Sequence, residues 1–272
     1  MKKFEGMLFC TDLDGTLFRD DKTVSKENLA AIEYFKSEGG LFTFITGRIP
    51  ITAKHIYDIV RPNAPYGCIN GAAIFDAQKG EYLYKTFLSE DAVELVNCVK
   101  AEMPDVALQF NTEKAVYFNN DNAAMEKFRR VTGLPFIPRR FEDVAEPVFK
   151  VVFAHEDEAR IEKLSQLLFS HPKSDNFDFI RSERRLYEIL PKGVSKGLLL
   201  KRLSSLLGID GRKTIAAGDY NNDVSMIKAA GVGFAVANAV AEARAVADYT
   251  TVSNNDHAIA AIIDGLDKGL YL

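Results

Sequence analysis

The sequence predicts an α/β protein: a Rossmann-like parallel-sheet core that carries an inserted α+β cap domain. In the first and last thirds of the chain, short apolar runs alternate with helix-length segments. That alternation is typical of βαβ units, which build parallel sheets. The middle has shorter strand patterns separated by prolines, which indicates a second, inserted domain. We therefore predict a core of residues 1–82 and 187–272 and a cap of residues 83–186.

The first third of the chain supplies three strands and two helices of the predicted core. Its apolar runs are short and continuous, as in strands that are buried on both faces of a parallel sheet. These strands are predicted at residues 7–11, 41–45 and 66–69. The first helix ends at Gly39, because glycine favours the end of a helix. The second helix begins at Pro50, with Ile51, Ile56 and Ile59 on its inner face.

The rest of the chain continues the same alternation, with shorter elements in the middle. Core helices are predicted at residues 196–207, 224–230 and 239–247, and core strands at 214–217 and 232–236. Cap strands are predicted at residues 106–110, 115–118 and 148–154, and cap helices at 92–101 and 158–169.

The composition is that of an ordinary globular protein. Of the 272 residues, 47% are hydrophobic and 26% are charged, and the net charge is -4. The chain therefore has no basic excess for binding nucleic acid or an acidic membrane surface, and no apolar run approaches the ~20 residues that span a bilayer. Its three cysteines are odd in number and lack the spacing of metal ligands. We therefore expect them to be reduced thiols. We expect a cytoplasmic protein that binds neither nucleic acid nor membranes; its oligomeric state is left open.

Two carboxylates follow the first predicted strand. The segment Asp12-Leu13-Asp14-Gly15-Thr16 comes directly after the apolar run 7–11. Residues i and i+2 of an extended chain point the same way, so we expect Asp12 and Asp14 side by side at a strand end, where open α/β sheets bind ligands. Adjacent acids repel, and a bound cation relieves that repulsion. The same residues also suit a hairpin turn, so the motif needs partners elsewhere in the chain.

Groups that suit an anion follow at two other places. Thr46, Gly47 and Arg48 end the second strand, where a hydroxyl and an unhindered glycine amide can bind an anion or can form a plain turn. Lys196 begins a helix. Its ammonium group can point to the same edge of the sheet, or can lie exposed, as lysines usually do.

A second pair of acids follows the strand at 214–217. Asp219 and Asp223 lie in the turn Gly218-Asp219-Tyr220-Asn221-Asn222-Asp223, which precedes a helix. Acids in that position can serve as caps, but two acids and two amides in one turn exceed what a cap requires. Carboxylates suit a hard ion such as Mg2+, whereas threonine, a glycine amide and lysine suit a phosphoryl group. The two sets together predict phosphoryl transfer.

The order of these motifs resembles the haloacid dehalogenase superfamily of phosphotransferases over essentially the whole chain. The motifs are DLDGT at 12–16, TGR at 46–48, a lysine at a helix start and GDxxND at 218–223. The position of the cap between the threonine and lysine motifs, and Asn70-Gly71-Ala72 before it, are similar to the Cof-type sugar-phosphatase branch.

The resemblance implies a role for each matching residue. Asp12 would be the nucleophile that forms an aspartyl-phosphate, and Asp14 would be the general acid and base. The phosphate would be bound by Thr46, Gly47, Lys196 and Asn222. Mg2+ would be held by Asp12, the main-chain carbonyl of Asp14, Asp219 and Asp223. The substrate would contact Arg48, Asn70 and Gly71.

We therefore expect a Mg2+-dependent phosphatase that acts on a small phosphorylated metabolite, foremost a sugar phosphate. A phosphosugar mutase could use the same phosphoenzyme. A signalling receiver also gathers acids, a threonine and a lysine, but it lacks the Asp-Gly-Thr turn and the cap. The cap should close over the site and contact the leaving group, although no cap residue is assigned to that task.

One late segment departs from the usual pattern of this branch. Relatives tend to carry an Asp-Gly-Val-like step after a Ser-Asn pair, whereas this chain has Ser253-Asn254-Asn255-Asp256-His257. Asn238-Ala239 does fit the pattern. The role of the segment 253–257 is left open.

Overall fold

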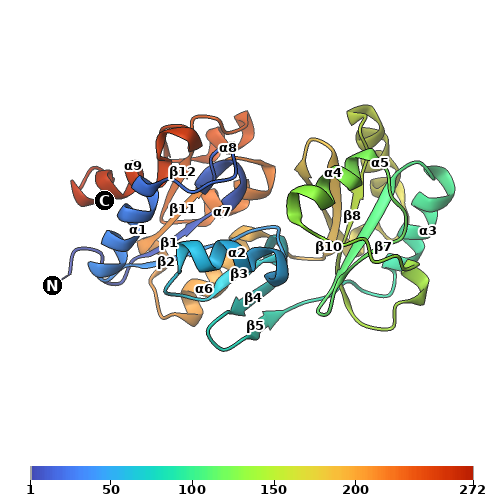
Figure 1. The fold of residues 1–272 in the computed structure, drawn as a ribbon, viewed down its shortest axis with the longest axis horizontal. Helices are drawn as coiled ribbons and strands as arrows, with labels where there is room; N and C mark the ends of the chain where they lie inside the picture. Colours follow the sequence, from blue (N-terminus) through green and yellow to red (C-terminus); the bar gives the residue numbers. More distant parts are fainter. Residues whose placement is uncertain (1, 272) are drawn as a thin grey trace. The chain divides into compact units, whose positions relative to one another are not determined.

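The structure is a computed structural model that describes residues 2–271, and its chain divides into two compact units (Figure 1). The core unit contains the residues up to Tyr84 and those from Ser195 onward, and the cap unit contains Lys85–Val194. The cap unit thus extends beyond residue 186, where the sequence had suggested its end. The reason is the strand β10 (Leu186–Pro191), which pairs with two cap strands rather than with the core sheet.

A five-stranded parallel sheet lies at the centre of the core unit, with the strand order β13-β12-β11-β1-β2. Its strands are β1 (Leu8–Thr11), β2 (Leu41–Phe44), β11 (Thr214–Gly218), β12 (Val232–Ala235) and β13 (Tyr249–Thr250). The middle strand β1 pairs in parallel with β11 and β2, so that Cys10 lies opposite Ala216 and Thr43. The predicted α/β core with a parallel sheet is confirmed.

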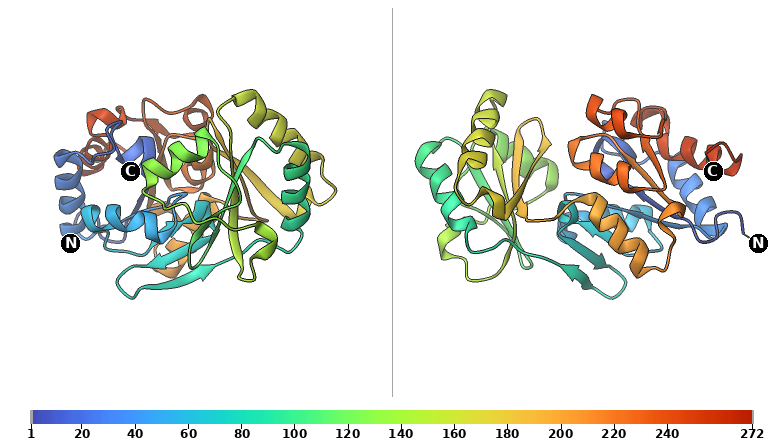
Figure 2. Two further views of the ribbon diagram at one scale, coloured as in Figure 1. Left: turned by 45° about the vertical axis from the view of Figure 1, so that its right-hand side comes forward. Right: turned by 180° about the vertical axis from the view of Figure 1, so that it is seen from behind.

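Helices cover both faces of this sheet because its strands present apolar side chains on both sides (Figures 1 and 2). Leu8 and Cys10 belong to an apolar cluster with α6 and α7, whereas the ring of Phe9 contacts those of Phe35 and Phe42 at centroid distances of 6.0 and 5.3 Å. The helices are α1 (Lys26–Ser37), α6 (Lys196–Leu206), α7 (Val224–Ala229), α8 (Ala241–Val246) and α9 (Ala258–Asp267). The helix α9 packs against α1.

The third predicted strand of the core does not join the parallel sheet. β3 (Tyr66–Cys68) forms an antiparallel pair with β4 (Ala73–Asp76), and both belong to a separate three-stranded sheet with β5 (Glu81–Lys85). A single parallel bridge between Ile45 and Gly67 links it to the end of β2. The chain turns back directly after β3, because Ile69 and Asn70 both adopt the left-handed conformation, with φ of 57° and 52°.

The predicted inner face of α2 (Pro50–Val60) is wrong at two of its three positions. Ile56 is buried, but Ile51 and Ile59 are exposed. The buried face instead consists of Ala53, Ile56 and Val60. Their spacing of three and four residues keeps them on one side of a helix, whereas Ile51 lies on another side.

The cap unit is built on an antiparallel sheet of order β7-β6-β8-β10-β9. Its strands are β6 (Ala107–Thr112), β7 (Val116–Phe118), β8 (Val148–Ala154), β9 (Phe177–Glu183) and β10. The helices α3 (Ala92–Glu102) and α5 (Glu158–Ser170) pack on one face of the sheet, over an apolar cluster that includes Phe110, Val151 and Phe153. The cap strands and helices that were predicted at these places are confirmed, while α4 (Ala123–Thr132), β9 and β10 were not predicted.

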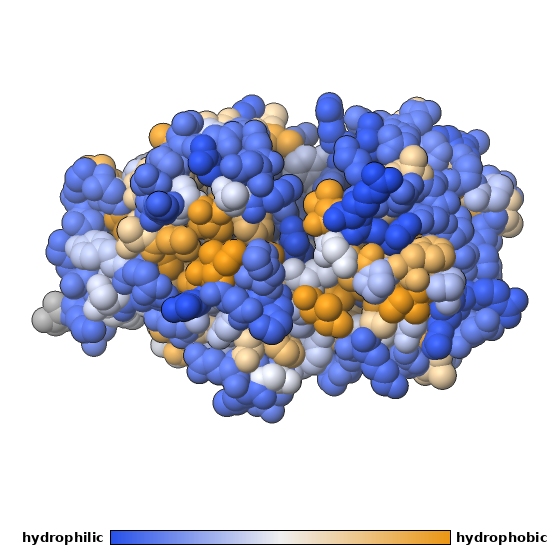
Figure 3. All heavy atoms as spheres, viewed as in Figure 1, coloured by the Kyte–Doolittle hydropathy of each residue, from blue (hydrophilic) through white to orange (hydrophobic). Residues whose placement is uncertain are grey.

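Each helix within residues 2–271 is too short or too polar to cross a lipid bilayer. The face of the molecule drawn in Figure 3 is mostly hydrophilic, with apolar side chains gathered in a few places.

Truncating Phe9 should destabilise the core unit strongly, because its fully buried ring packs between α1 and β2. We expect Phe9→Ala to lower the free energy of unfolding by about 3–5 kcal/mol, the usual cost of removing a buried ring. Urea unfolding followed by circular dichroism measures it. The exposed Ile51→Ala is the control and should change the value by less than about 0.5 kcal/mol; equal effects of the two variants would contradict the packing described here.

Candidate active site

A buried lysine joins two aspartates at the carboxyl end of the core sheet. Lys196, the first residue of α6, places its Nζ 2.6 Å from Oδ1 of Asp12 and 2.5 Å from Oδ1 of Asp223. All three residues are buried. Burial alone would lower the pKa of Lys196, but the two adjacent carboxylates raise it, so the ammonium stays charged.

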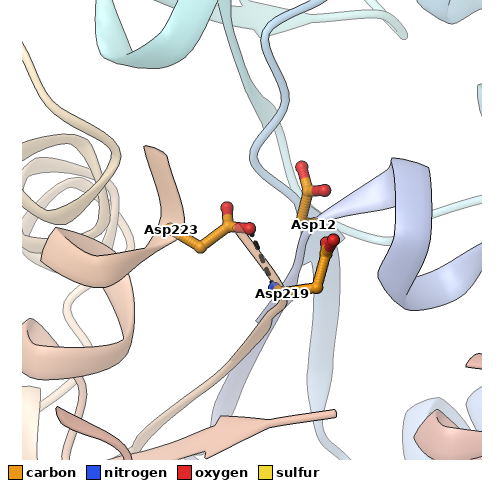
Figure 4. A group of neighbouring side chains, drawn as sticks. All are labelled: Asp12, Asp219 and Asp223. Carbon is orange, nitrogen blue, oxygen red and sulfur yellow. Dashed lines mark hydrogen bonds between the residues drawn. The ribbon is translucent and has the colours of Figure 1, made fainter. Parts of the chain in front are cut away.

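A third carboxylate completes the cluster shown in Figure 4. Asp12, Asp219 and Asp223 each offer an oxygen, and these oxygens all lie within 4.8 Å of one another. Oδ2 of Asp223 accepts hydrogen bonds from the amides of Asp219 and Tyr220 at 3.0 and 3.1 Å. Thr16 donates its hydroxyl hydrogen to Oδ1 of Asp219 at 2.8 Å. Backbone and side-chain donors therefore fix the orientation of the carboxylate groups of Asp219 and Asp223.

When its three acids are ionised, the cluster carries more negative than positive charge. Burial and the neighbouring Asp223 raise the pKa of Asp12 to about 7, although Lys196 opposes the shift. Burial, Asp223 and Asp12 raise the pKa of Asp219 to about 8. Three carboxylates and a single ammonium leave uncompensated negative charge in a buried place, which a divalent cation with oxygen ligands would neutralise.

Two glycines let the loops approach this closely. Gly15 adopts a left-handed φ of 86°, and a Cβ at that position would lie 2.4 Å from Oδ2 of Asp219. At Gly218 a Cβ would lie 2.4 Å from the Cβ of Asp223. Any side chain at either position would displace an acid of the cluster, so both glycines are required by space, and Gly15 is required by its conformation as well.

Asp14 has different partners from Asp12. Its carboxylate accepts two hydrogen bonds from Arg48, from Nε and from one terminal nitrogen, both at 2.9 Å, and a third from Lys22 at 3.1 Å. Burial would raise the pKa of Asp14, but Arg48 and Lys22 together lower it. We had expected Asp12 and Asp14 to point the same way, as residues i and i+2 of an extended strand do. They have different partners because β1 ends at Thr11, and the alternation of a strand does not continue through the turn that holds Asp14.

The remaining predicted residues lie around the same strand ends. Thr46 is buried, and its hydroxyl accepts a hydrogen bond from the amide of Arg48 at 3.2 Å. A Cβ on Gly47 would lie 2.9 Å from the side-chain oxygen of Asn70, so the two residues are closely packed. Asn222 donates to that same oxygen at 3.1 Å. Gly71, with φ of 108°, lies against the backbone of Ser195, directly before Lys196.

The structure thus brings the predicted residues of the core to one end of the sheet, and it adds two that the sequence analysis did not assign. Thr16 orients Asp219, and Lys22 contacts Asp14. Thr16 could have been found, because it is the last residue of the DLDGT motif. Lys22 had no such signal, since it belongs to a polar surface turn in which any charged residue is ordinary.

A divalent cation should bind this cluster more weakly as the pH falls. Asp12 and Asp219 must be deprotonated to act as ligands, and their pKa values of about 7 and 8 lie between pH 6 and pH 8.5, the interval of the measurement. We expect the Kd for Mg2+, measured by calorimetry, to rise by about 10-fold or more between pH 8.5 and pH 6. Asp219→Asn should weaken Mg2+ binding at pH 8.5, whereas the exposed Asp210→Asn should not; a pH-independent Kd would contradict the assignment.

Comparisons with known proteins show the family to which this chain belongs. Residues 9–263 match the model of the family described as haloacid dehalogenase-like hydrolase. The Bacillus subtilis (strain 168) protein YxeH is 30% identical over 268 residues, which cover 95% of this chain and 97% of that protein. The 5-amino-6-(5-phospho-D-ribitylamino)uracil phosphatase YitU of the same organism is 26% identical over 265 residues, covering 94% of this chain and 96% of that one.

The fold is also found among solved structures. A crystal structure of a haloacid dehalogenase-like hydrolase from Bacteroides thetaiotaomicron has a TM-score of 0.84 and 24% sequence identity to this protein, covering 95% of this chain and 98% of the other. The family match covers most of both segments of the core unit and the whole cap unit between them in the sequence. The chain therefore belongs to the family of haloacid dehalogenase-like hydrolases, as the order of its motifs had implied.

Proposed function

We propose that this hydrolase is a Mg2+-dependent phosphatase of small phosphorylated metabolites, and that it acts through an aspartyl-phosphate on Asp12. The observation that carries the proposal is the position of Asp12. Its carboxylate is buried, held by Lys196 at 2.6 Å and surrounded by two further acids, at a sheet edge that also presents Thr46 and Gly47. A nucleophilic carboxylate, a cation site and groups for a phosphoryl anion thus occupy one place.

The residues present fit a magnesium ion. Oxygen ligands of carboxylates are what Mg2+ prefers, and the three acids leave negative charge that Lys196 does not balance. We assign Asp12, Asp219, Asp223 and the main-chain carbonyl of Asp14 as its protein ligands. When bound, the ion would neutralise charge on the phosphoryl oxygens and lower the repulsion between substrate and nucleophile.

The side chains of this protein account for both steps of hydrolysis. An oxygen of Asp12 attacks phosphorus, the bond from phosphorus to the leaving oxygen breaks, and Asp14 gives that oxygen its proton. A water molecule then attacks phosphorus, Asp14 takes the proton of this water, and the bond between phosphorus and Asp12 breaks. Phosphate leaves, and both aspartates return to their starting protonation states.

Donors around Asp12 would hold the phosphoryl group. We assign this task to the Thr46 hydroxyl, the Gly47 amide, Lys196 and the side chain of Asn222. In the structure, Arg48 binds Asp14 through two hydrogen bonds. If Arg48 turns to an anionic group of the substrate, the pKa of Asp14 loses its main lowering partner and rises toward the range that suits a general acid.

Phosphate esters of polyhydroxylated carbon chains are the substrate class that we favour, with sugar phosphates foremost. The relative YitU is named for a substrate with a phosphorylated ribityl chain, which is a primary phosphate on such a chain. Asn70 and Gly71, which pack against Gly47 and the start of α6, are our candidates for further substrate contacts.

Substituting the two aspartates of the first motif should separate their roles. Asp12→Asn removes the nucleophile and should lower kcat for p-nitrophenyl phosphate by more than about 10^3-fold. Asp14→Asn removes the general acid and base and should lower it by about 10^2 to 10^4-fold. Phosphate release measures both, with EDTA as the metal-removal control. Turnover that survives Asp12→Asn or EDTA would contradict the proposal.

A panel of phosphorylated metabolites should identify the substrate and the reaction type together. Inorganic phosphate and phosphorylated isomers are measured in the same samples. We expect phosphate release to exceed isomer formation, with the highest kcat/KM among sugar and polyol phosphates. Isomer formation in excess of phosphate release would make the protein a mutase, and a phosphoprotein that persists for hours would make it a phosphate-storing receiver.

A further inference from the structure

Two residues of the segment 253–257, whose role the sequence left open, are hydrogen-bonded to the chain directly after the turn that carries Asp14. Asn254 is buried, and its side-chain nitrogen donates to the carbonyl of Phe18 at 2.9 Å and to Oδ1 of Asp20 at 3.0 Å. Asn255 forms a second pair of bonds with Asp20, accepting from its amide at 3.1 Å and donating to its Oδ2 at 2.9 Å. The segment thereby holds the downstream end of the turn.

Asn238 connects the same segment to Gly15, in the middle of the turn. Its side-chain nitrogen donates to the carbonyl of Gly15 at 2.8 Å, and its side-chain oxygen accepts from the amide of Asn254 at 3.0 Å. Gly15 lies directly between Asp14 and Thr16 in the sequence. An asparagine suits this place because one amide group supplies both a donor and an acceptor.

The loop that contains Asn238 is also bonded to the second acidic motif. The amide of Val240 donates to the carbonyl of Asp219 at 2.9 Å. The loop therefore contacts the peptide of Gly15 on one side and that of Asp219 on the other, and the hydroxyl of Thr16 connects these two motifs directly. The turn is thus held at its middle and at its downstream end.

We propose that Asn238 and Asn254 are positioning residues for Asp14. They fix the peptide of Gly15 and the Phe18–Asp20 segment, and so determine where the carboxyl group of Asp14 meets the leaving oxygen. This inference rests on the proposed function, because it concerns the general acid of that reaction. Neither asparagine is assigned a contact with the substrate or the metal.

Aryl phosphates with different leaving groups test this role. Phenolate is a poorer leaving group than p-nitrophenolate and depends more on proton donation by Asp14. We expect Asn238→Ala and Asn254→Ala to lower kcat/KM for phenyl phosphate by about 10-fold or more, and for p-nitrophenyl phosphate by less than about 3-fold, because a misplaced acid costs most where it is needed most. Asn238 is exposed, so its variant should fold even if that of the buried Asn254 does not.

Two controls make the result specific. Val252 lies directly before the segment 253–257, and its side chain is 41% exposed. Val252→Ala should leave kcat/KM for both substrates unchanged. In an Asp14→Asn background, Asn238→Ala should have no further selective effect on phenyl phosphate, because the two residues act through one proton transfer.

The outcomes separate this inference from the proposed function. An equal loss of kcat/KM for both substrates, or no loss, would overturn the positioning role while phosphate release by the wild type persists. A selective loss that is additive with Asp14→Asn would also overturn it. Absence of Asp12-dependent phosphate release in the wild type would instead overturn the proposed function.

Discussion

The site depends on the ion pairs that the buried ammonium of Lys196 forms. This ammonium lies between Asp12 and Asp223, two acids that come from the ends of different strands and are both buried. Without it, three carboxylates would face one another in a poorly solvated place, where like charges are costly. The lysine is the first residue of α6, so the packing of this helix on the sheet decides where the charge stands. Fold and site are coupled through one side chain.

The centre of the site could be predicted from the sequence because it depends on topology more than on detail. Asp12, Asp219 and Thr46 follow apolar runs, and the carboxyl ends of parallel strands meet at one edge. The partners of Asp14 could not be predicted in this way. They depend on the conformation of a turn after the strand has ended, and on Lys22 in a polar loop. Side-chain alternation carries no information there.

The fold shows the same division between regular and irregular parts. Continuous apolar runs predicted β1, β2, β3, β11 and β12, whereas β4, β5 and β13 were not predicted. The direction of pairing of β3 depends on the left-handed turn at Ile69 and Asn70, which the residue types do not indicate. The helix α4 was missed because only Ala124 and Met125 of its ten residues are buried, so its apolar pattern is weak. The edge strand β9 was missed for a similar reason, being mostly half-buried.

The position of β1 in the middle of the core sheet has a consequence for how the chain reaches this structure. One neighbour, β2, follows within about thirty residues, but the other, β11, begins only at Thr214, after the whole cap has been made. On a ribosome, the nascent N-terminal segment must therefore wait with one edge of β1 unpaired until the C-terminal part emerges, whereas the cap can complete its own sheet earlier. Such an edge invites pairing with other chains, so the slow arrival of β11 is the stage at which a molecular chaperone would be of most use to this protein.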